Sequence, residues 1–207
     1  MSSINIYITP INLYLKLQGI DNICPKRREK INDIKRPEDK ARALVAGLQL
    51  KKFCGVTNDD QLGYEEKGKP YLKNNDLFFN ISHSGDFVVL ATASHIIGVD
   101  LEKISPYNFA VAKHCFTQNE LEWLINDGRI EAFYHVWTAK ESIMKAIGQG
   151  LLIPPKSFCV IPIKDSPHFV AGESWYLDLK KFKEHIICSA SNVKHDIINI
   201  LYVEKLL

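Results

Sequence analysis

The sequence lacks the features that would indicate a disulfide framework, a zinc site or a membrane span. Its five cysteines are odd in number, scattered, and never spaced as Cys-x-x-Cys, which disfavours both disulfides and zinc. No apolar run approaches the ~20 residues of a membrane span, and no basic segment precedes the apolar residues of the N-terminus. We therefore expect a reduced, cytoplasmic protein with no membrane partner.

Several nucleotide and hydrolase signatures are also missing. Neither G-x-x-x-x-G-K-[ST] nor G-x-G-x-x-G occurs, and there is no G-x-S-x-G elbow. The formal net charge is only +2, so we expect no nucleic-acid partner. The basic residues are unevenly distributed, however, and a cluster of them between positions 26 and 42 could hold a small anionic ligand. This cluster comprises Lys26, Arg27, Arg28, Lys30, Lys35, Arg36, Lys40 and Arg42.

The order of predicted elements divides the chain into two halves, each with helices followed by strands. We predict an α+β fold of two similar lobes related by pseudo-two-fold symmetry, each a small antiparallel sheet with a packed helix, covering residues 1–104 and 105–207. Short links between strands favour antiparallel hairpins. The predicted helices are 25–34, 37–53 and 130–147, with a capping box at Thr117–Glu120; the predicted strands are 4–8, 77–81, 87–92, 96–99, 158–161, 174–177, 185–188 and 197–201.

Acidic residues stand in two short motifs about forty residues apart. Asp100 and Glu102 end an apolar run, and in a strand their side chains project from the same face. Glu141 and Lys145 stack on one face of a helix. If the strand and the helix meet, three carboxylates form a platform for a divalent cation beside a positive charge for phosphate oxygens. Taken alone, each pair also fits an ordinary role, as a solvated strand end or an exposed ion pair.

Two turn segments offer weaker signals. The run from Asn80 to Gly85 leaves a strand into a turn, where a serine hydroxyl, the His83 imidazole and backbone amides could receive phosphate oxygens. The run from Gly68 to Tyr71 places Lys69 at a hairpin tip. Either segment could equally be a plain structural turn.

Taken in order, the motifs resemble those of the 4′-phosphopantetheinyl transferases of the surfactin-synthetase-activating type. The resemblance runs from about Pro25 to Leu152. It implies a pseudo-dimer within one monomeric chain that transfers the 4′-phosphopantetheine arm of coenzyme A to a serine of an apo acyl or peptidyl carrier protein, releasing adenosine 3′,5′-bisphosphate. The motifs that carry it are A-R-x-L-x-A-G, G-K-P-Y, F-N-I-S-H-S-G, I-G-V-D-L-E and F-Y-x-x-W-T-x-K-E-S-x-x-K-x-x-G-x-G-L.

The resemblance also implies roles for individual residues. Glu141 would act as the base for the carrier serine, directly or through a metal-bound water, and Lys145 would neutralise the departing phosphate. Arg27 stands where family members commonly carry lysine, and an arginine can still hold a phosphate. The implied Mg²⁺ ligands, with Mn²⁺ possible, are Asp100, Glu102 and Glu141, and the implied coenzyme A contacts are Arg27, Lys30, Arg42, Lys69, Ser82, His83 and Lys145.

The resemblance further suggests a docking segment for the carrier protein, along Asn108 to Leu124. There we expect exposed apolar groups such as Phe116 to make contact, with Lys113 attracting an acidic partner. Two other functions remain open from the sequence. One is a different Mg²⁺-dependent phosphoryl-transfer or hydrolytic enzyme that uses the same carboxylates, and the other is a non-catalytic protein that binds coenzyme A or a carrier.

Overall fold

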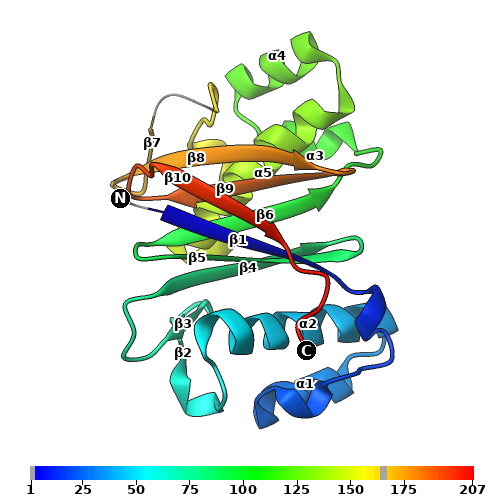
Figure 1. Cartoon of the computed structure of the whole chain (residues 1–207). Coiled ribbons are helices and arrows are strands. Elements are labelled where there is room, and N and C mark those ends of the chain that lie inside the picture. Colours follow the sequence, from blue (N-terminus) through cyan, green and yellow to red (C-terminus); the bar gives the residue numbers. More distant parts are fainter. Residues whose placement is uncertain (1–2, 164–166) are drawn as a thin grey trace.

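The structure is a computed structural model that describes residues 3–163 and 167–207. It is an α+β protein in which two four-stranded sheets lie between two groups of helices (Figure 1). The first sheet has the strand order β10-β1-β5-β4 and the second has the order β6-β9-β8-β7, while β2 and β3 form a separate hairpin. The strands are β1 (Ser3–Pro10), β2 (Leu62–Tyr64), β3 (Pro70–Leu72), β4 (Phe78–Ser84), β5 (Phe87–Ala93), β6 (Ile97–Lys103), β7 (His168–Val170), β8 (Glu173–Phe182), β9 (His185–Ser191) and β10 (Ile197–Tyr202).

Each lobe has one long helix that packs on its sheet, which agrees with the predicted pair of similar lobes. Helices α2 and α5 are both eighteen residues long. Both end at a glycine in the left-handed conformation, Gly55 and Gly148, as C-capping favours. None of the helices in the described part of the chain combines the length and hydrophobicity that a membrane span needs. The α-helices are α1 (Pro25–Asp33), α2 (Pro37–Cys54), α3 (Phe109–Cys115), α4 (Gln118–Asp127) and α5 (Ile130–Ile147).

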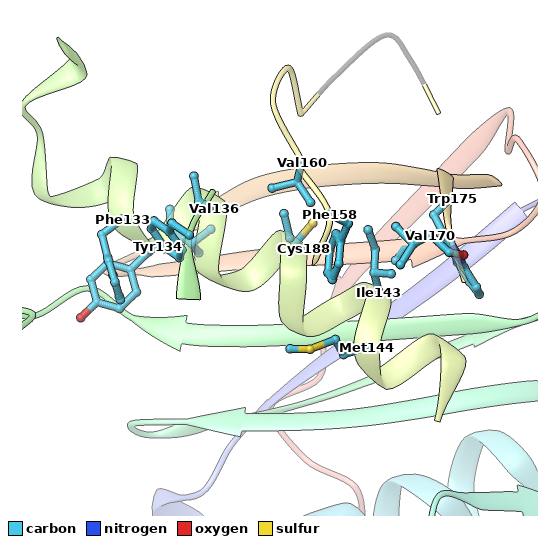
Figure 2. Packing of buried hydrophobic residues seen from close by; sticks show 14 of the residues in the cluster. Phe133, Tyr134, Val136, Ile143, Met144, Phe158, Val160, Val170, Trp175 and Cys188 are labelled. Atoms are coloured by element: carbon cyan, nitrogen blue, oxygen red, sulfur yellow. The ribbon is translucent and has the colours of Figure 1, made fainter. Parts of the chain in front are cut away.

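The hydrophobic core follows these layers. One cluster fills the space between the two sheets and includes Ile6, Val89 and Val99. A second, larger cluster lies between α5 and the second sheet, where Ile143 and Trp175 are almost completely buried (Figure 2). The buried apolar side chains of α5 are closely packed against the second sheet. This packing fixes the orientation of the helix, and so the position of its polar face relative to the strands.

Two strands cross the boundary that we predicted at residue 104. Strand β6 precedes this residue but pairs with β9 in the second sheet. Strand β10 lies near the C-terminus but returns to the first sheet, where it pairs with β1. This last pairing is parallel, the one parallel pairing among the described strands. The division at 104 stays a prediction, and each lobe is completed by a strand from the other half of the sequence.

Two local predictions are wrong. The short link after β5 does not form a hairpin with β6, because both edges of β5 already pair, with β1 and with β4. The segment 158–161 is not a strand. Its backbone groups are bonded by buried charged side chains instead, since Lys140 donates to the carbonyl of Phe158 at 2.6 Å and the Val160 N–H donates to Glu120 at 2.8 Å.

Candidate functional site

Strand β6 uses its two faces for different purposes. Its odd-numbered residues, such as Val99 and Leu101, enter the core between the sheets. Its even-numbered residues point the other way, because side chains alternate along a strand. Gly98 accordingly lies against the backbone of α5, and Asp100 contacts Lys145 on the same helix. The alternation of side chains along β6 therefore brings its acidic motif against α5, the helix that carries Glu141 and Lys145.

Lys145 joins the two motifs directly. Its Nζ lies 2.5 Å from Asp100 Oδ1 and 2.9 Å from the hydroxyl oxygen of Ser82 on β4. Glu141 lies one turn earlier on α5, and its electrostatic interactions with Asp100, Lys145 and Glu102 place it in the same group. The predicted meeting of strand and helix is thus present, and Ser82 belongs to it.

Burial and the charge of Asp100 oppose the ionisation of the other two carboxylates, Glu102 and Glu141. Burial, and then the charge of Asp100, raise the pKa of Glu141, while Lys145 lowers it. Burial and Asp100 also raise the pKa of Glu102, against the hydrogen bonds that it receives from Ser84 and Trp137. Such a site is stabilised by additional positive charge.

The donor set fits a divalent cation, although no site is assembled as the side chains stand. Within residues 3–163 and 167–207, no group of three or more Asp, Glu, His or Cys side chains is positioned to hold a metal ion. Asp100 Oδ2, however, is buried without a hydrogen-bond partner. A buried unpaired carboxylate oxygen beside two further carboxylates is a chemically suitable position for Mg²⁺ or Mn²⁺.

A cleft of about 440 Å³ opens beside these groups. Its lining includes Glu141, Lys145 and Lys69. A second cavity of about 590 Å³ carries the basic residues of α1, among them Arg27 and Lys30. The two cavities share Gly68 and Pro70 at the tip of the β2–β3 hairpin. Basic side chains line both cavities, which favours a ligand with several anionic groups.

The basic residues predicted to contact coenzyme A fall into three places. Arg27 and Lys30 line the larger cavity, where the Lys30 ammonium lies 5.6 Å from the ring centre of Tyr64. Lys69 borders the cleft and donates to the carbonyl of Ala146 at 2.5 Å, so it caps the end of α5. Burial lowers the pKa of Lys69, and nearby Glu65 opposes this.

Arg42 lies on α2, and its side chain reaches the turn between β4 and β5. Its guanidinium donates to the carbonyl of Gly85 at 2.7 Å and to Asp39 at 2.5 Å. His83 lies near the end of β4, just before this turn, and its pKa is lowered by partial burial and by the charges of Arg42 and Lys145. His83 therefore lies within the electrostatic influence of both Arg42 and Lys145, and it does not line the larger cavity.

One part of the predicted docking segment is wrong. Phe116 is fully buried and stacks against Phe133, with 5.4 Å between ring centres, so it cannot offer an exposed surface. Phe109 and Val111 on α3 are each 37% exposed. The exposure of Phe116 was expected from the resemblance alone, and the local sequence carries no pattern that decides its burial.

Sequence reasoning missed Ser84 and Gly98. The Ser84 hydroxyl donates to Glu102 Oε2 at 3.0 Å, and Gly98 permits the close approach of β6 and α5. The alternation of short polar residues at positions 80, 82 and 84 was a usable signal, because it places all three on one face of the strand.

Comparisons with known proteins show the family to which the chain belongs. Residues 15–95 match a family model described as the N-terminal part of 4′-phosphopantetheinyl transferase, and residues 96–194 match the 4′-phosphopantetheinyl transferase superfamily. The chain is 36% identical over 155 residues to a 4′-phosphopantetheinyl transferase of Bacillus subtilis, covering 70% of this chain and 69% of that protein. It is also 33% identical over 147 residues to the 4′-phosphopantetheinyl transferase gsp of Aneurinibacillus migulanus, covering 67% of this chain and 62% of that protein. A third relative is the L-aminoadipate-semialdehyde dehydrogenase-phosphopantetheinyl transferase of Mus musculus, 33% identical over 216 residues, with 87% and 70% coverage.

The chain belongs to the 4′-phosphopantetheinyl transferase superfamily. The matched segments span about two thirds of the length of these relatives.

Proposed function

We propose that the protein transfers the 4′-phosphopantetheine arm of coenzyme A to a serine of an apo acyl or peptidyl carrier protein. The serine oxygen forms a bond to the β-phosphorus of coenzyme A, the bond from that phosphorus to the bridging oxygen breaks, and adenosine 3′,5′-bisphosphate leaves. The observation that carries the proposal is the meeting of Asp100, Glu141 and Lys145 at one cleft, in a chain of this superfamily.

Glu141 and Lys145 take the proposed chemical roles. A serine hydroxyl is a weak nucleophile and needs a base, and a carboxylate whose pKa is raised is a better proton acceptor than an ordinary glutamate. The Lys145 ammonium is positioned to neutralise the charge that develops on the departing phosphate. Its contact with Asp100 keeps it at the cleft before any substrate arrives.

Asp100, Glu102 and Glu141 are the proposed ligands of a Mg²⁺ ion, and Mn²⁺ would suit the same oxygens. When bound, the cation supplies charge neutralisation to the pyrophosphate. The buried, unpartnered Oδ2 of Asp100 supports this assignment.

Coenzyme A would be held along both cavities. Arg27 and Lys30 would bind phosphate at the far end, Lys69 would lie over the middle, and Ser82 with His83 and Arg42 would complete the β4 side. Lys69 would have to exchange the carbonyl of Ala146 for the ligand. We propose a monomer, because both lobes of the site come from one chain.

The carrier would dock on α3 and α4. Phe109 and Val111 are exposed there, and the Lys113 ammonium lies 5.4 Å from the ring centre of Phe109. Lys113 would attract an acidic carrier surface.

Intact-mass analysis of an apo carrier protein incubated with coenzyme A, Mg²⁺ and the enzyme tests the function. We expect one phosphopantetheine adduct per carrier, and none with Asp100→Ala enzyme. Cleavage of coenzyme A without a carrier would favour a hydrolase instead. Binding of coenzyme A with no turnover under any condition would indicate a non-catalytic binding protein.

A further inference from the structure

Each carboxylate of β6 at the site receives a hydrogen bond from a serine of β4. The Ser82 hydroxyl donates to Asp100 Oδ1 at 2.9 Å, and the Ser84 hydroxyl donates to Glu102 Oε2 at 3.0 Å. The serines are two residues apart on one strand, and so are the carboxylates on the other. Because both strands have the same two-residue spacing on this face, each serine faces one carboxylate.

The same hydroxyls are fixed by the backbone of β6. Strand β6 pairs with β9 along one edge, and β4 approaches the other edge without a backbone ladder. Short polar side chains of β4 instead accept hydrogen bonds from the backbone N–H groups along that edge. These N–H groups would otherwise lack a hydrogen-bond partner inside the protein. The bonds run from Val99 N to Asn80 Oδ1 (2.9 Å), from Leu101 N to Ser82 Oγ (3.2 Å) and from Lys103 N to Ser84 Oγ (3.0 Å).

This arrangement determines where the hydroxyl proton points. A serine hydroxyl has one proton to donate and lone pairs to accept with. Because the Lys103 N–H is directed at the Ser84 oxygen, the proton of Ser84 is free to be donated to Glu102. One side-chain conformation of Ser84 therefore satisfies both bonds, the one accepted from the backbone of β6 and the one donated to Glu102.

We propose that Ser84 is a positioning residue for the cation site, holding Glu102 Oε2 so that this carboxylate stays beside Asp100 and Glu141. The inference rests on the proposed function, since it concerns the site that would bind the metal. Ser82 orients Asp100 in the same way, but it also accepts from Lys145. Ser84 therefore gives the cleaner test of orientation.

The need for such a holding contact follows from charge. Asp100 and Glu102 repel each other when both are ionised, so donors are needed to hold Glu102 beside Asp100. Ser84 and Trp137 supply these donors, and without Ser84 the half-buried side chain of Glu102 would keep only the Trp137 contact. Outer partners that orient a metal ligand typically change metal affinity or activity 10–100-fold when removed. A purely structural serine would instead affect only folding stability.

The decisive measurement is Mn²⁺ binding by electron paramagnetic resonance, with saturating coenzyme A and no carrier protein, so that no turnover occurs. A parallel titration of coenzyme A alone corrects for Mn²⁺ held by its phosphates. We expect Ser84→Ala to weaken Mn²⁺ binding about tenfold, and Ser84→Thr, which keeps the hydroxyl, to restore most of it. Ser84→Cys keeps the size but donates weakly, and it should fall between these values if the alanine variant folds poorly.

Ser191→Ala is the matched control. Ser191 also combines a donated and an accepted bond, to the carbonyl and from the N–H of Val193 at 2.6 and 3.1 Å, but it lies at the other end of the β6–β9 pair. It should bind Mn²⁺ like the wild type. Wild-type affinity in both Ser84→Ala and Ser84→Cys would overturn the inference while leaving the transferase function intact. A wild-type protein that binds no Mn²⁺ would overturn the inference and the metal assignment together.

Discussion

Gly98 on β6 lies directly against the backbone of Ser142 on α5. A methyl group at position 98 would overlap the carbonyl oxygen of Ser142 and lie 2.5 Å from the backbone nitrogen of Ala146. Backbone atoms within a helix cannot move aside as a side chain can. We therefore expect Gly98→Ala to destabilise the fold by about 1–3 kcal/mol or more, as overpacking does, and to lower transfer strongly by pushing Lys145 away from Asp100.

Urea denaturation checks this prediction against Gly47→Ala. A methyl at Gly47 would meet the side chains of Arg27 and Ile23 at 2.7 and 2.9 Å, and the Arg27 atom belongs to a flexible chain. The new alanine also favours the helix by up to about 1 kcal/mol. Gly47→Ala should therefore be much milder, and equal losses of stability in the two variants would contradict the backbone-contact explanation.

A buried ion pair fastens α4 and the segment 155–160 to α5. Lys140 Nζ lies 2.9 Å from Glu120 Oε2, with side-chain exposures of 1% and 0%. Lys140→Met would leave Glu120 buried without a counter-charge, so we expect a loss of about 3–5 kcal/mol in the free energy of unfolding. Adding Glu120→Gln should recover part of this loss, because the amide removes the buried charge and its single carbonyl oxygen can still accept one of the two sets of bonds, from Thr117 or from Val160, that now go to different oxygens of Glu120.

Lys181→Met provides the comparison for an exposed pair. Lys181 lies 3.1 Å from Glu131, but its side chain is 56% exposed, so its loss should cost at most about 1 kcal/mol. Chemical denaturation of the wild type, Lys140→Met, Glu120→Gln and the double variant gives the coupling energy of the buried pair. An additive double variant would argue that Lys140 and Glu120 do not act as a pair.

Local sequence signals predicted much of the fold. The helix from Ile130 to Ile147 was predicted at both ends, since its apolar stripe is long and Gly148 terminates it. The capping box of Thr117 and Glu120 is also confirmed. What could not be predicted depends on pairing between distant residues. The partner of β6 is decided by which strand edges are already occupied, and this information is not local.

The site shows the same division. Residues with chemistry of their own, such as Asp100 and Lys145, could be selected from their motifs. Ser84 and Gly98 act only through the backbone or carboxylate that faces them. The alternation of polar residues at 80, 82 and 84 places Ser84 on one face with Ser82, but nothing local shows which groups that face meets. The buried network around Glu120 also removed the strand expected at 158–161, because side chains satisfied its backbone groups.

Lys145 and a bound cation would compete for the same carboxylate. In the protein without ligands, the Lys145 ammonium contacts Asp100 Oδ1, where it neutralises part of the acidic cluster. We expect Lys145→Ala to lower kcat about 100-fold or more, as loss of a charge-stabilising group does, while Mn²⁺ binding stays unchanged or becomes tighter. Transfer kinetics at saturating Mg²⁺ measure kcat, and the Mn²⁺ titration by electron paramagnetic resonance measures metal affinity. Loss of metal affinity in this variant would be evidence that Lys145 organises the ligands rather than the leaving phosphate.

Glu141 should reduce the stability of the metal-free protein at neutral pH. Its pKa in the folded state is raised, first by burial and then by Asp100, so folding disfavours the ionised form that the unfolded chain prefers at neutral pH. The penalty is present above the folded pKa and disappears as the pH falls below the unfolded value, about 4.3. In EDTA, Glu141→Gln should therefore melt at a higher temperature than the wild type at pH 7.5, and this advantage should shrink steadily toward pH 4, although the variant transfers little or nothing.

Glu131→Gln on the same helix is the control of opposite sign: the pKa of Glu131 is lowered by its hydrogen bond to Lys181, so this variant should gain no stability at pH 7.5. Thermal unfolding from pH 4 to pH 8 decides the matter, and a melting temperature of Glu141→Gln that matches the wild type at every pH would show that Glu141 ionises freely, removing the physical basis for its role as the base.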